Sequence, residues 1–296
     1  DDFSSLEISL LNIEQPFSKG FLSFREGSNQ VDLEGAGSGI AMLAALLLLE
    51  QVSERSGDDL ILLIDEPELH LHPQLQSRLA DHMQKSVAQT IVTTHSPLFV
   101  DLGYWRGISR MTRDQTYPKQ DKLAEKLGTK TIAEHLDDIP EFYYHETTFS
   151  SNDSELFFAR RVLLVEGPVE KYGLPRLAHV LGCRLDQLTV ISSNGKSKIP
   201  HYVTVCHAYE IPVMVLFDLD GKDEKDSENA MVIEASAGTA LHSFKTSFEQ
   251  LLGIGKNAEH KASRALAIID GLKTKEAIPK EITEAIDVVN KWLAQR

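Results

Sequence analysis

The sequence is poor in cysteine and has no apolar segment long enough to cross a bilayer. Only Cys183 and Cys206 occur in 296 residues, too few for a disulfide framework or a thiolate zinc site, and we assign them no role. The longest apolar run, residues 40–49, is half the length of a membrane-spanning helix, and no signal-peptide pattern follows Asp1. These absences predict a cytoplasmic protein that does not enter the membrane.

The sequence also lacks an excess of positive charge. Its 30 basic residues stand against 44 acidic ones, a formal net charge of -14. This balance argues against a generally basic nucleic-acid-binding surface, because phosphates are contacted mainly by Lys and Arg. The objection weakens if acidic residues hold divalent cations, which attract phosphate. With 42% hydrophobic residues, the chain is long enough to form two globular domains.

A change of pattern near residue 35 marks the first functional candidate. Residues 1–34 include the alternating segment Leu6–Leu10 and predict a β-rich lead-in. The loop Gly35–Gly39 then runs into residues 40–49, which are apolar nearly all round and predict a buried helix. A glycine-rich turn before a helix is either a simple turn or a place where backbone N–H groups meet a phosphate. The loop alone does not decide between these functions.

Residues 60–66 have the pattern of a Walker B segment. The apolar run Leu60–Ile64 predicts a strand buried on both faces of a parallel sheet, and it ends in Asp65 and Glu66. In that chemistry the first acid holds Mg²⁺ through water, and the second orients and deprotonates the attacking water. A second short strand, residues 90–94, leads to His95. Taken singly, these side chains could also be two solvated acids and a core histidine.

The order of these segments resembles the ABC-type ATPases of the SMC, RecF and OLD kind over about residues 31–100. The resemblance implies a signature loop, a Walker B strand and a switch histidine, of which Glu66 and His95 are catalytic. The implied nucleotide-binding set is Ser38, Gly39, Asp65, Glu66 and His95. It also implies a homodimer that closes on ATP, because the signature loop of one subunit meets the nucleotide of the other. No G-x-x-x-x-G-K-[ST] motif occurs in the sequence, so ATP with Mg²⁺ is expected to bind only together with a half that bears a P-loop. This chain alone is expected to hydrolyse ATP negligibly.

A second alternation of strands and helices follows a segment of weak periodicity, residues 111–154. Strand-like segments at 162–165, 188–192 and 213–217 alternate with helix-like segments at 169–181 and 199–209. That order predicts a parallel sheet with right-handed crossovers. We therefore predict an α/β protein in three parts: an ATPase-like part at 1–110, a connecting segment at 111–154, and a second α/β domain at 155–296.

Acidic residues follow two strands of this second domain. Glu166 ends the first strand, and Glu170 returns to the same side of the following helix four residues later. Asp218 and Asp220 lie two apart after the third strand. Carboxyl ends of parallel strands share one edge of a sheet, where four carboxylates repel each other unless cations lie between them. Oxygen ligands favour Mg²⁺ or Mn²⁺, and the alternative is a set of solvated acids at strand ends.

These acids resemble the signature of the Toprim fold, which is a Glu after the first strand and Asp-x-Asp after the third. The segment Leu156–Glu170, the dipeptide Leu174-Pro175 and the loop Asn194-Gly195-Lys196 are similar to the OLD (overcoming lysogenization defect) nucleases. That family joins an ABC-type ATPase to a Toprim domain in this order, and the resemblance spans about residues 31–250. It implies that residues 1–110 are the C-terminal half of an ABC-type ATPase domain and that 155–296 form a Toprim nuclease domain with a Rossmann-like sheet.

The resemblance also extends the candidate site. It implies that two Mg²⁺ or Mn²⁺ ions are held by Glu166, Glu170, Asp218, Asp220, Glu249 and Ser247. Cations about 3.5–4 Å apart would activate water and stabilise the leaving 3′ oxygen. It further implies a catalytic lysine at the scissile phosphate, for which Lys275 is our choice and Lys273 the reserve. Lys196 and Lys198 are the next candidates.

We therefore predict a metal-dependent DNA endonuclease that is regulated by ATP and acts in phage defence, with a partner protein of a defence system as a further option. The alternative is a non-cutting ATP-gated DNA clamp or assembly scaffold of the SMC/RecF type, but a scaffold has no need of a repulsive carboxylate cluster. Topoisomerase chemistry would need a nucleophilic tyrosine. Tyr172 and Tyr202 have the pattern of packing residues.

Overall fold

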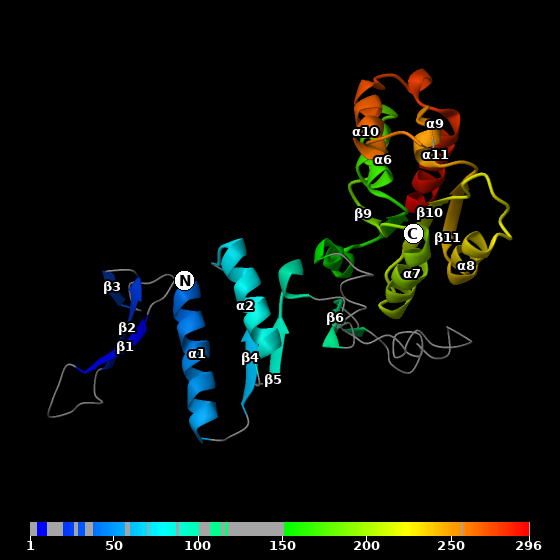
Figure 1. Cartoon of the computed structure of the whole chain (residues 1–296). Helices are drawn as coiled ribbons and strands as arrows, with labels where there is room; N and C mark the ends of the chain where they lie inside the picture. The colour runs from blue at the N-terminus through cyan, green and yellow to red at the C-terminus, as the bar shows by residue number, and fades with distance from the viewer. Residues whose placement is uncertain are drawn as a thin grey trace. The chain divides into compact units, whose positions relative to one another are not determined.

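The computed structural model of the chain divides into two compact units, residues 1–100 and residues 101–296, which are described separately (Figure 1). It describes residues 5–10, 20–26, 29–32, 38–56, 60–69, 71–86, 89–100, 107–113, 116–117, 151–255 and 257–295. Most of the predicted connecting segment, residues 111–154, lies outside these ranges. No helix among the described residues is long and apolar enough to span a membrane.

The first unit begins with an antiparallel sheet and continues with two parallel strands. Strands β1 (Ser5–Leu10), β2 (Gly20–Glu26) and β3 (Asn29–Asp32) pair in sequence order, as the alternation near the start of the chain predicts. Helix α1 (Ser38–Ser56) precedes β4 (Ile61–Asp65), and α2 (Pro73–Lys85) leads to the parallel partner β5 (Gln89–Thr93). The short 3-10 helix η2 (Pro97–Phe99) follows.

Only one face of the β4–β5 pair is covered by described residues. Leu62 packs in a cluster with Leu46 of α1 and with Leu79 of α2. On the opposite face, Ile61, Leu63 and Ile91 are 59%, 74% and 54% exposed. The prediction of a strand buried on both faces is therefore wrong for the described residues, because this sheet has two strands and helices on one side. The prediction of a buried helix at residues 40–49 is also wrong for the described residues, since Leu47 and Leu49 of α1 are 41% and 48% exposed.

The second unit is built on a four-stranded parallel sheet with the order β11-β10-β8-β9. Its strands are β8 (Val162–Val165), β9 (Thr189–Ser192), β10 (Val213–Asp218) and β11 (Ala240–Phe244). Its helices are α6 (Pro168–Val180), α7 (Ile199–Ala208), α8 (Ser227–Ala235), α9 (Phe248–Leu251), α10 (Lys261–Gly271) and α11 (Lys280–Ala294). Shorter elements are β6 (Arg110–Met111), β7 (Thr116–Tyr117), η4 (Ser151–Phe158), η5 (Lys196–Lys198) and η6 (Lys275–Ala277).

Both faces of this sheet are covered by helices. Figure 1 shows α6, α9, α10 and α11 on one side and α7 and α8 on the other. Leu163, Val165 and Leu216 belong to the core cluster shared with α6, α10 and α11. Every residue of β8 and β10 is buried, as continuous apolar runs predict for strands inside a parallel sheet.

The sheet brings the carboxyl ends of β8, β9 and β10 to one edge. Strand β8 is central, since it pairs in parallel with β9 on one side and with β10 on the other. The segments that follow β8 and β9 are hydrogen-bonded to each other, because Gly195 N donates to Glu166 O at 3.0 Å. The chain segments that carry the predicted acids therefore begin from neighbouring strand ends.

Helix α11 is anchored to the opposite edge of the sheet by Arg161, which directly precedes β8. Its guanidinium donates to the carbonyls of Trp292 at 2.8 Å and Leu293 at 3.2 Å, and it lies 5.4 Å from the Trp292 ring centroid. A cation at a helix C-terminus satisfies carbonyls that have no partner within the helix. We expect Arg161→Ala to lower the free energy of unfolding by about 1.5–3 kcal/mol in urea titrations. Arg160→Ala, at the exposed neighbouring position, is the control, and equal stability of the two variants would contradict this anchoring role.

Candidate active site

A cavity of about 770 Å³ lies at the carboxyl edge of the second unit's sheet. It is lined by the six residues predicted to bind cations, together with glycines, a proline, an asparagine and two lysines. The lining residues are Glu166, Gly167, Pro168, Glu170, Asn194, Gly195, Asp218, Asp220, Lys222, Ser247, Glu249 and Lys261. The structure thus brings together side chains from segments that are up to 95 positions apart in the chain, from Glu166 to Lys261.

Glu166 and Glu170 enter the cavity from the β8–α6 turn. Glu166 Oε2 accepts a hydrogen bond of 3.4 Å from the backbone N–H of Asp218. Glu170 lies in the first turn of α6, is 4% exposed, and its Oε2 has no hydrogen-bond partner. Burial raises the pKa of Glu170 to about 8, and the neighbouring Glu249 and Glu166 add to the effect. Burial also raises the pKa of Glu166, against the opposing charge of Lys196.

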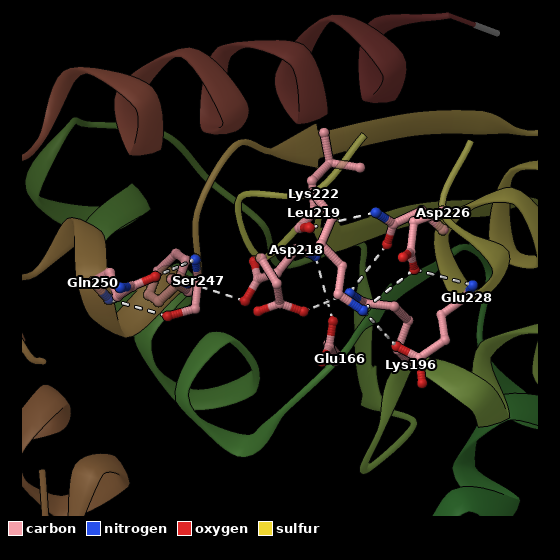
Figure 2. A network of polar contacts seen from close by, with 12 residues as sticks. Glu166, Lys196, Asp218, Leu219, Lys222, Asp226, Glu228, Ser247 and Gln250 are labelled. Atoms are coloured by element: carbon pink, nitrogen blue, oxygen red, sulfur yellow. Dashed lines mark hydrogen bonds and ion pairs between the residues drawn. The ribbon is translucent and has the colours of Figure 1, made fainter. Parts of the chain in front are cut away.

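Asp218 is the last residue of β10 and lies at the centre of the polar network drawn in Figure 2. It is 4% exposed; its Oδ2 accepts from Phe248 N at 3.0 Å, and its Oδ1 has no hydrogen-bond partner. Burial raises the pKa of Asp218 to about 9, with the nearby carboxylate of Glu170 as the next cause. Burial and the neighbouring acid thus favour the protonated forms of Glu170 and Asp218 in the absence of a cation.

Asp220 reaches the cavity from a turn of unusual backbone conformation. Its φ is 57° and that of Gly221 is 75°, both in the left-handed region, where a non-glycine residue is strained. Asp220 Oδ2 lies 2.6 Å from the ammonium of Lys196, which also donates to Asn229 Oδ1 at 3.1 Å. Asp218 and Asp220 therefore line the same cavity, as predicted, but their partners differ. Asp218 accepts from a backbone N–H, and Asp220 is paired with an ammonium group.

Ser247 and Glu249 line the cavity at the start of α9, as the resemblance implies. Ser247 is the N-cap of this helix: its Oγ accepts from Gln250 N at 3.3 Å, and its own N–H donates to Gln250 Oε1 at 3.3 Å. This reciprocal pair is a capping box. It orients the first turn of α9, and with it Glu249, toward the cavity.

The donor set suits a hard divalent cation. Glu170 Oε2 and Asp218 Oδ1 are buried oxygens without a hydrogen-bond partner, on two side chains that line the same cavity. Such groups are costly unless something satisfies them, and carboxylate oxygens are the ligands that Mg²⁺ and Mn²⁺ prefer. Within the described ranges, no three His, Cys, Asp or Glu side chains yet converge closely enough to hold an ion. Side-chain rotation would therefore have to complete the coordination.

The structure does not bring the two predicted lysines to this cavity. Lys275 lies in η6, between α10 and α11, and both Lys275 and Lys273 are exposed and absent from the lining. Their catalytic role stays a prediction. Instead, Lys261 at the first position of α10 and Lys222 line the cavity. No motif in the sequence marks Lys261, because it reaches the site through the packing of α10 against α6.

In the first unit, the predicted Walker B residues also come together. Thr93 Oγ1 donates to Asp65, and Glu66 Oε1 lies 3.5 Å from His95 Nε2. Glu66 has a φ of 45°, so its backbone is held in a strained conformation at the strand end. Of the predicted nucleotide-binding residues at the start of α1, Gly39 is buried, and the side chain of Ser38 lies outside the described residues.

Two tyrosines were predicted to be packing residues. Tyr202 is fully buried, and its hydroxyl donates to Asp153, so that prediction is confirmed. Tyr172 is 53% exposed, so the same prediction is wrong for Tyr172. Tyr172 is on the solvent side of α6, which packs its other side against α10. It does not line the cavity.

Two protein-family models match separate parts of the chain. Residues 157–220 match the model of the "Overcoming lysogenization defect protein-like, TOPRIM domain". Residues 3–100 match the model of the "AAA ATPase domain". The first match covers β8, β9 and β10 with all four of the acids predicted from the strand ends.

Two curated relatives carry the same name. The chain is 27% identical over 298 residues to the OLD nuclease of Thermus scotoductus, which covers 91% of this chain and 55% of that protein. It is 25% identical over 179 residues to the Old nuclease of Escherichia phage P2, which covers 57% of this chain and 29% of that protein. The chain therefore spans about half or less of the length of these relatives. Among solved structures, the C-terminal region of the Burkholderia pseudomallei OLD protein aligns with a TM-score of 0.35 at 19% identity, over 46% of this chain and all of that one.

The second unit, with its parallel sheet, thus matches a Toprim domain, and the first unit matches an ATPase domain. The matched Toprim model is the OLD-like one, and the chain is similar to two OLD nucleases. The resemblance that its motifs predicted is confirmed.

Proposed function

We propose that this chain carries the nuclease site of an ATP-regulated, metal-dependent DNA endonuclease. The single observation that carries the proposal is the pair of buried, unpartnered carboxylate oxygens on Glu170 and Asp218 in one cavity. A fold that only docks other proteins gains nothing from two desolvated acids at one strand edge, since they raise its free energy in the absence of a cation. The two curated relatives are both named nucleases.

In phosphodiester hydrolysis, the acids and Ser247 of the cavity would bind cations, and a lysine would contact the phosphate. Bound divalent cations would supply Lewis-acid activation of the attacking water and of the phosphate. Glu166, Glu170 and Asp218 would hold them from the strand ends, with Glu249, Asp220 and Ser247 completing the set. Lys261 lines the same cavity and carries a positive charge to meet non-bridging phosphate oxygens. The cavity volume of about 770 Å³ is enough for a nucleotide-sized part of a DNA strand.

The first unit would act as the ATP-dependent switch. Asp65, Glu66 and His95 are close together at the ends of β4 and β5, as hydrolysis of a nucleotide in this type of domain requires. By the same likeness, Ser38 and Gly39 would contact the nucleotide of a second subunit, so the active form would be a homodimer. A role in phage defence, with or without a partner protein, belongs to the same proposal.

A supercoiled-plasmid assay tests the function directly. With Mn²⁺ or Mg²⁺ we expect the purified chain to produce nicked or linear DNA, and with EDTA we expect none, because the carboxylate cluster cannot activate water without a cation. The same preparation of Asp218→Asn controls for contaminating nucleases. DNA binding without cleavage in either metal would overturn the proposal and favour the non-cutting clamp.

A further inference from the structure

The carboxylates of the cavity fall into two classes by their partners. Glu170 Oε2 and Asp218 Oδ1 are buried and have no hydrogen-bond partner among the described residues. Asp220, in contrast, is held by an ammonium group at 2.6 Å. A cation that approaches Glu170 Oε2 and Asp218 Oδ1 displaces no hydrogen-bond donor from these two oxygens, whereas a cation that approaches Asp220 must compete with a lysine.

That lysine is built into the fold. Lys196 follows the Asn194-Gly195 turn at the end of β9, and its side chain is 6% exposed. A buried lysine is rare unless it is paired. Figure 2 shows Lys196 within the polar network around Asp218 and Glu166. The charge of Lys196 also opposes the rise that burial causes in the pKa of Glu166, so its field reaches beyond Asp220 into the cluster.

The second partner of Lys196 fixes its position. Asn229 of α8 is fully buried, and its Oδ1 accepts from the ammonium of Lys196 at 3.1 Å. Its Nδ2 donates to the carbonyls of Leu219 at 3.3 Å and Asp223 at 3.0 Å. Asn229 therefore ties the lysine and the turn that carries Asp220 to one point. Asn229 thus positions both members of the Lys196–Asp220 ion pair, Lys196 through its ammonium and Asp220 through the backbone of the adjacent Leu219.

We propose that Lys196 is a positioning residue that makes the two cation sites of this cavity unequal. One cation binds tightly through Glu166, Glu170 and Asp218, while a second binds weakly because Asp220 must first leave Lys196. The ammonium thus takes the place of the second cation until that cation, or the cation together with the substrate phosphate, displaces it. This inference rests on the proposed function, since it presupposes that the carboxylates hold metal ions.

Direct Mn²⁺ binding to the full chain tests the inference without relying on cleavage. Electron paramagnetic resonance of free Mn²⁺ should reveal one tight and one weaker site per wild-type chain. Lys196→Met should tighten the weaker site by about tenfold or more, because it removes a competing charge from the partly desolvated cluster. Lys196→Arg keeps the charge and should keep both sites unequal. Lys198→Met removes a charge from the same loop without touching Asp220, and it should change neither affinity more than about threefold.

The outcomes separate this inference from the proposed function. If the wild-type chain binds no Mn²⁺, the proposed metal-dependent nuclease fails. If it binds Mn²⁺ but Lys196→Met leaves both affinities unchanged or weakens both, the role of Lys196 is wrong. Asp220→Asn gives a second test should Lys196→Met fail to fold: it should abolish the weaker site and leave the tight one. Loss of the tight site in Asp220→Asn would also overturn the inference.

Discussion

Asp218→Asn is expected to reduce metal-dependent DNA cleavage by more than about 100-fold while leaving the fold intact. Residues that only orient metal ligands already cost about 10- to 100-fold when changed, so loss of a ligand should exceed that range. Asparagine keeps an oxygen that can accept from Phe248 N, which lies 3.0 Å from Asp218 Oδ2. The substitution therefore removes the charge and preserves the hydrogen bond that places α9.

The same substitution should stabilise the metal-free protein. The folded chain keeps a proton on Asp218 up to a pKa of about 9, whereas an unfolded aspartate loses its proton near pH 4. Between these values the folded state binds more protons than the unfolded state, so the free energy of unfolding falls as pH rises. Asp218→Asn has no such loss. Its melting temperature should exceed that of the parent, and the difference should grow between about pH 5 and pH 8.

Calorimetry in EDTA and plasmid cleavage in Mn²⁺ together decide this prediction. Asp186→Asn, at an exposed position outside the cavity, is the matched control and should leave both unchanged. Excess Mn²⁺ should raise the melting temperature of the parent, since a cation that binds only the folded state stabilises it. Normal cleavage by Asp218→Asn, or a lower melting temperature in EDTA, would contradict the assignment of Asp218 as a buried cation ligand.

Lys261→Met is expected to slow single-turnover cleavage by about 100-fold or more. A positive charge that meets the phosphate oxygens as negative charge develops on them stabilises the transition state more than the ground state. Its loss therefore lowers kcat and leaves Mn²⁺ affinity nearly unchanged. Lys261 lines the cavity from the first turn of α10. Lys275, the lysine that the resemblance predicts, is exposed outside it.

The comparison of Lys261→Met with Lys275→Met, at saturating DNA and Mn²⁺, tests the two assignments against each other. If only Lys261 meets the phosphate, Lys275→Met should cleave within about threefold of the parent and flatten the salt dependence of DNA binding by no more than about one unit of slope. Slow cleavage by Lys275→Met together with normal cleavage by Lys261→Met would instead assign the phosphate contact to Lys275. If both variants cleave normally, neither lysine contacts the scissile phosphate in the transition state. Lys273→Met would then be the next variant to measure.

Much of the second unit was predictable because its signals are local. The apolar runs that form β8, β9 and β10 and the helical segments between them match the predicted boundaries to within one residue. Alternation of short buried strands with helices specifies parallel pairing, and parallel pairing places Glu166 and Asp218 at one edge. The acids at this edge of the sheet could therefore be predicted from the sequence without knowing how any helix packs.

In the first unit, the local sequence predicts the strand but not which of its faces is buried. The run Leu60–Ile64 predicts a strand, and β4 forms, but its composition does not reveal which faces are covered. In the described residues Leu62 is buried and Leu63 is 74% exposed. Burial of a strand face depends on the layer packed against it, and that layer comes from elsewhere in a chain or from another chain.

The sequence by itself determined the strand ends, the acids that follow them and the order of the two domains, because these depend on hydrophobic runs and on residues adjacent in the chain. The tertiary structure decided which groups share the cavity and in what state. Lys196 meets Asp220 and Asn229 across 24 and 33 positions, and α10 carries Lys261 to the same edge. Desolvation then raises the pKa of Glu170 and Asp218. Burial and long-range pairing are properties of the packed chain, so no local pattern encodes them.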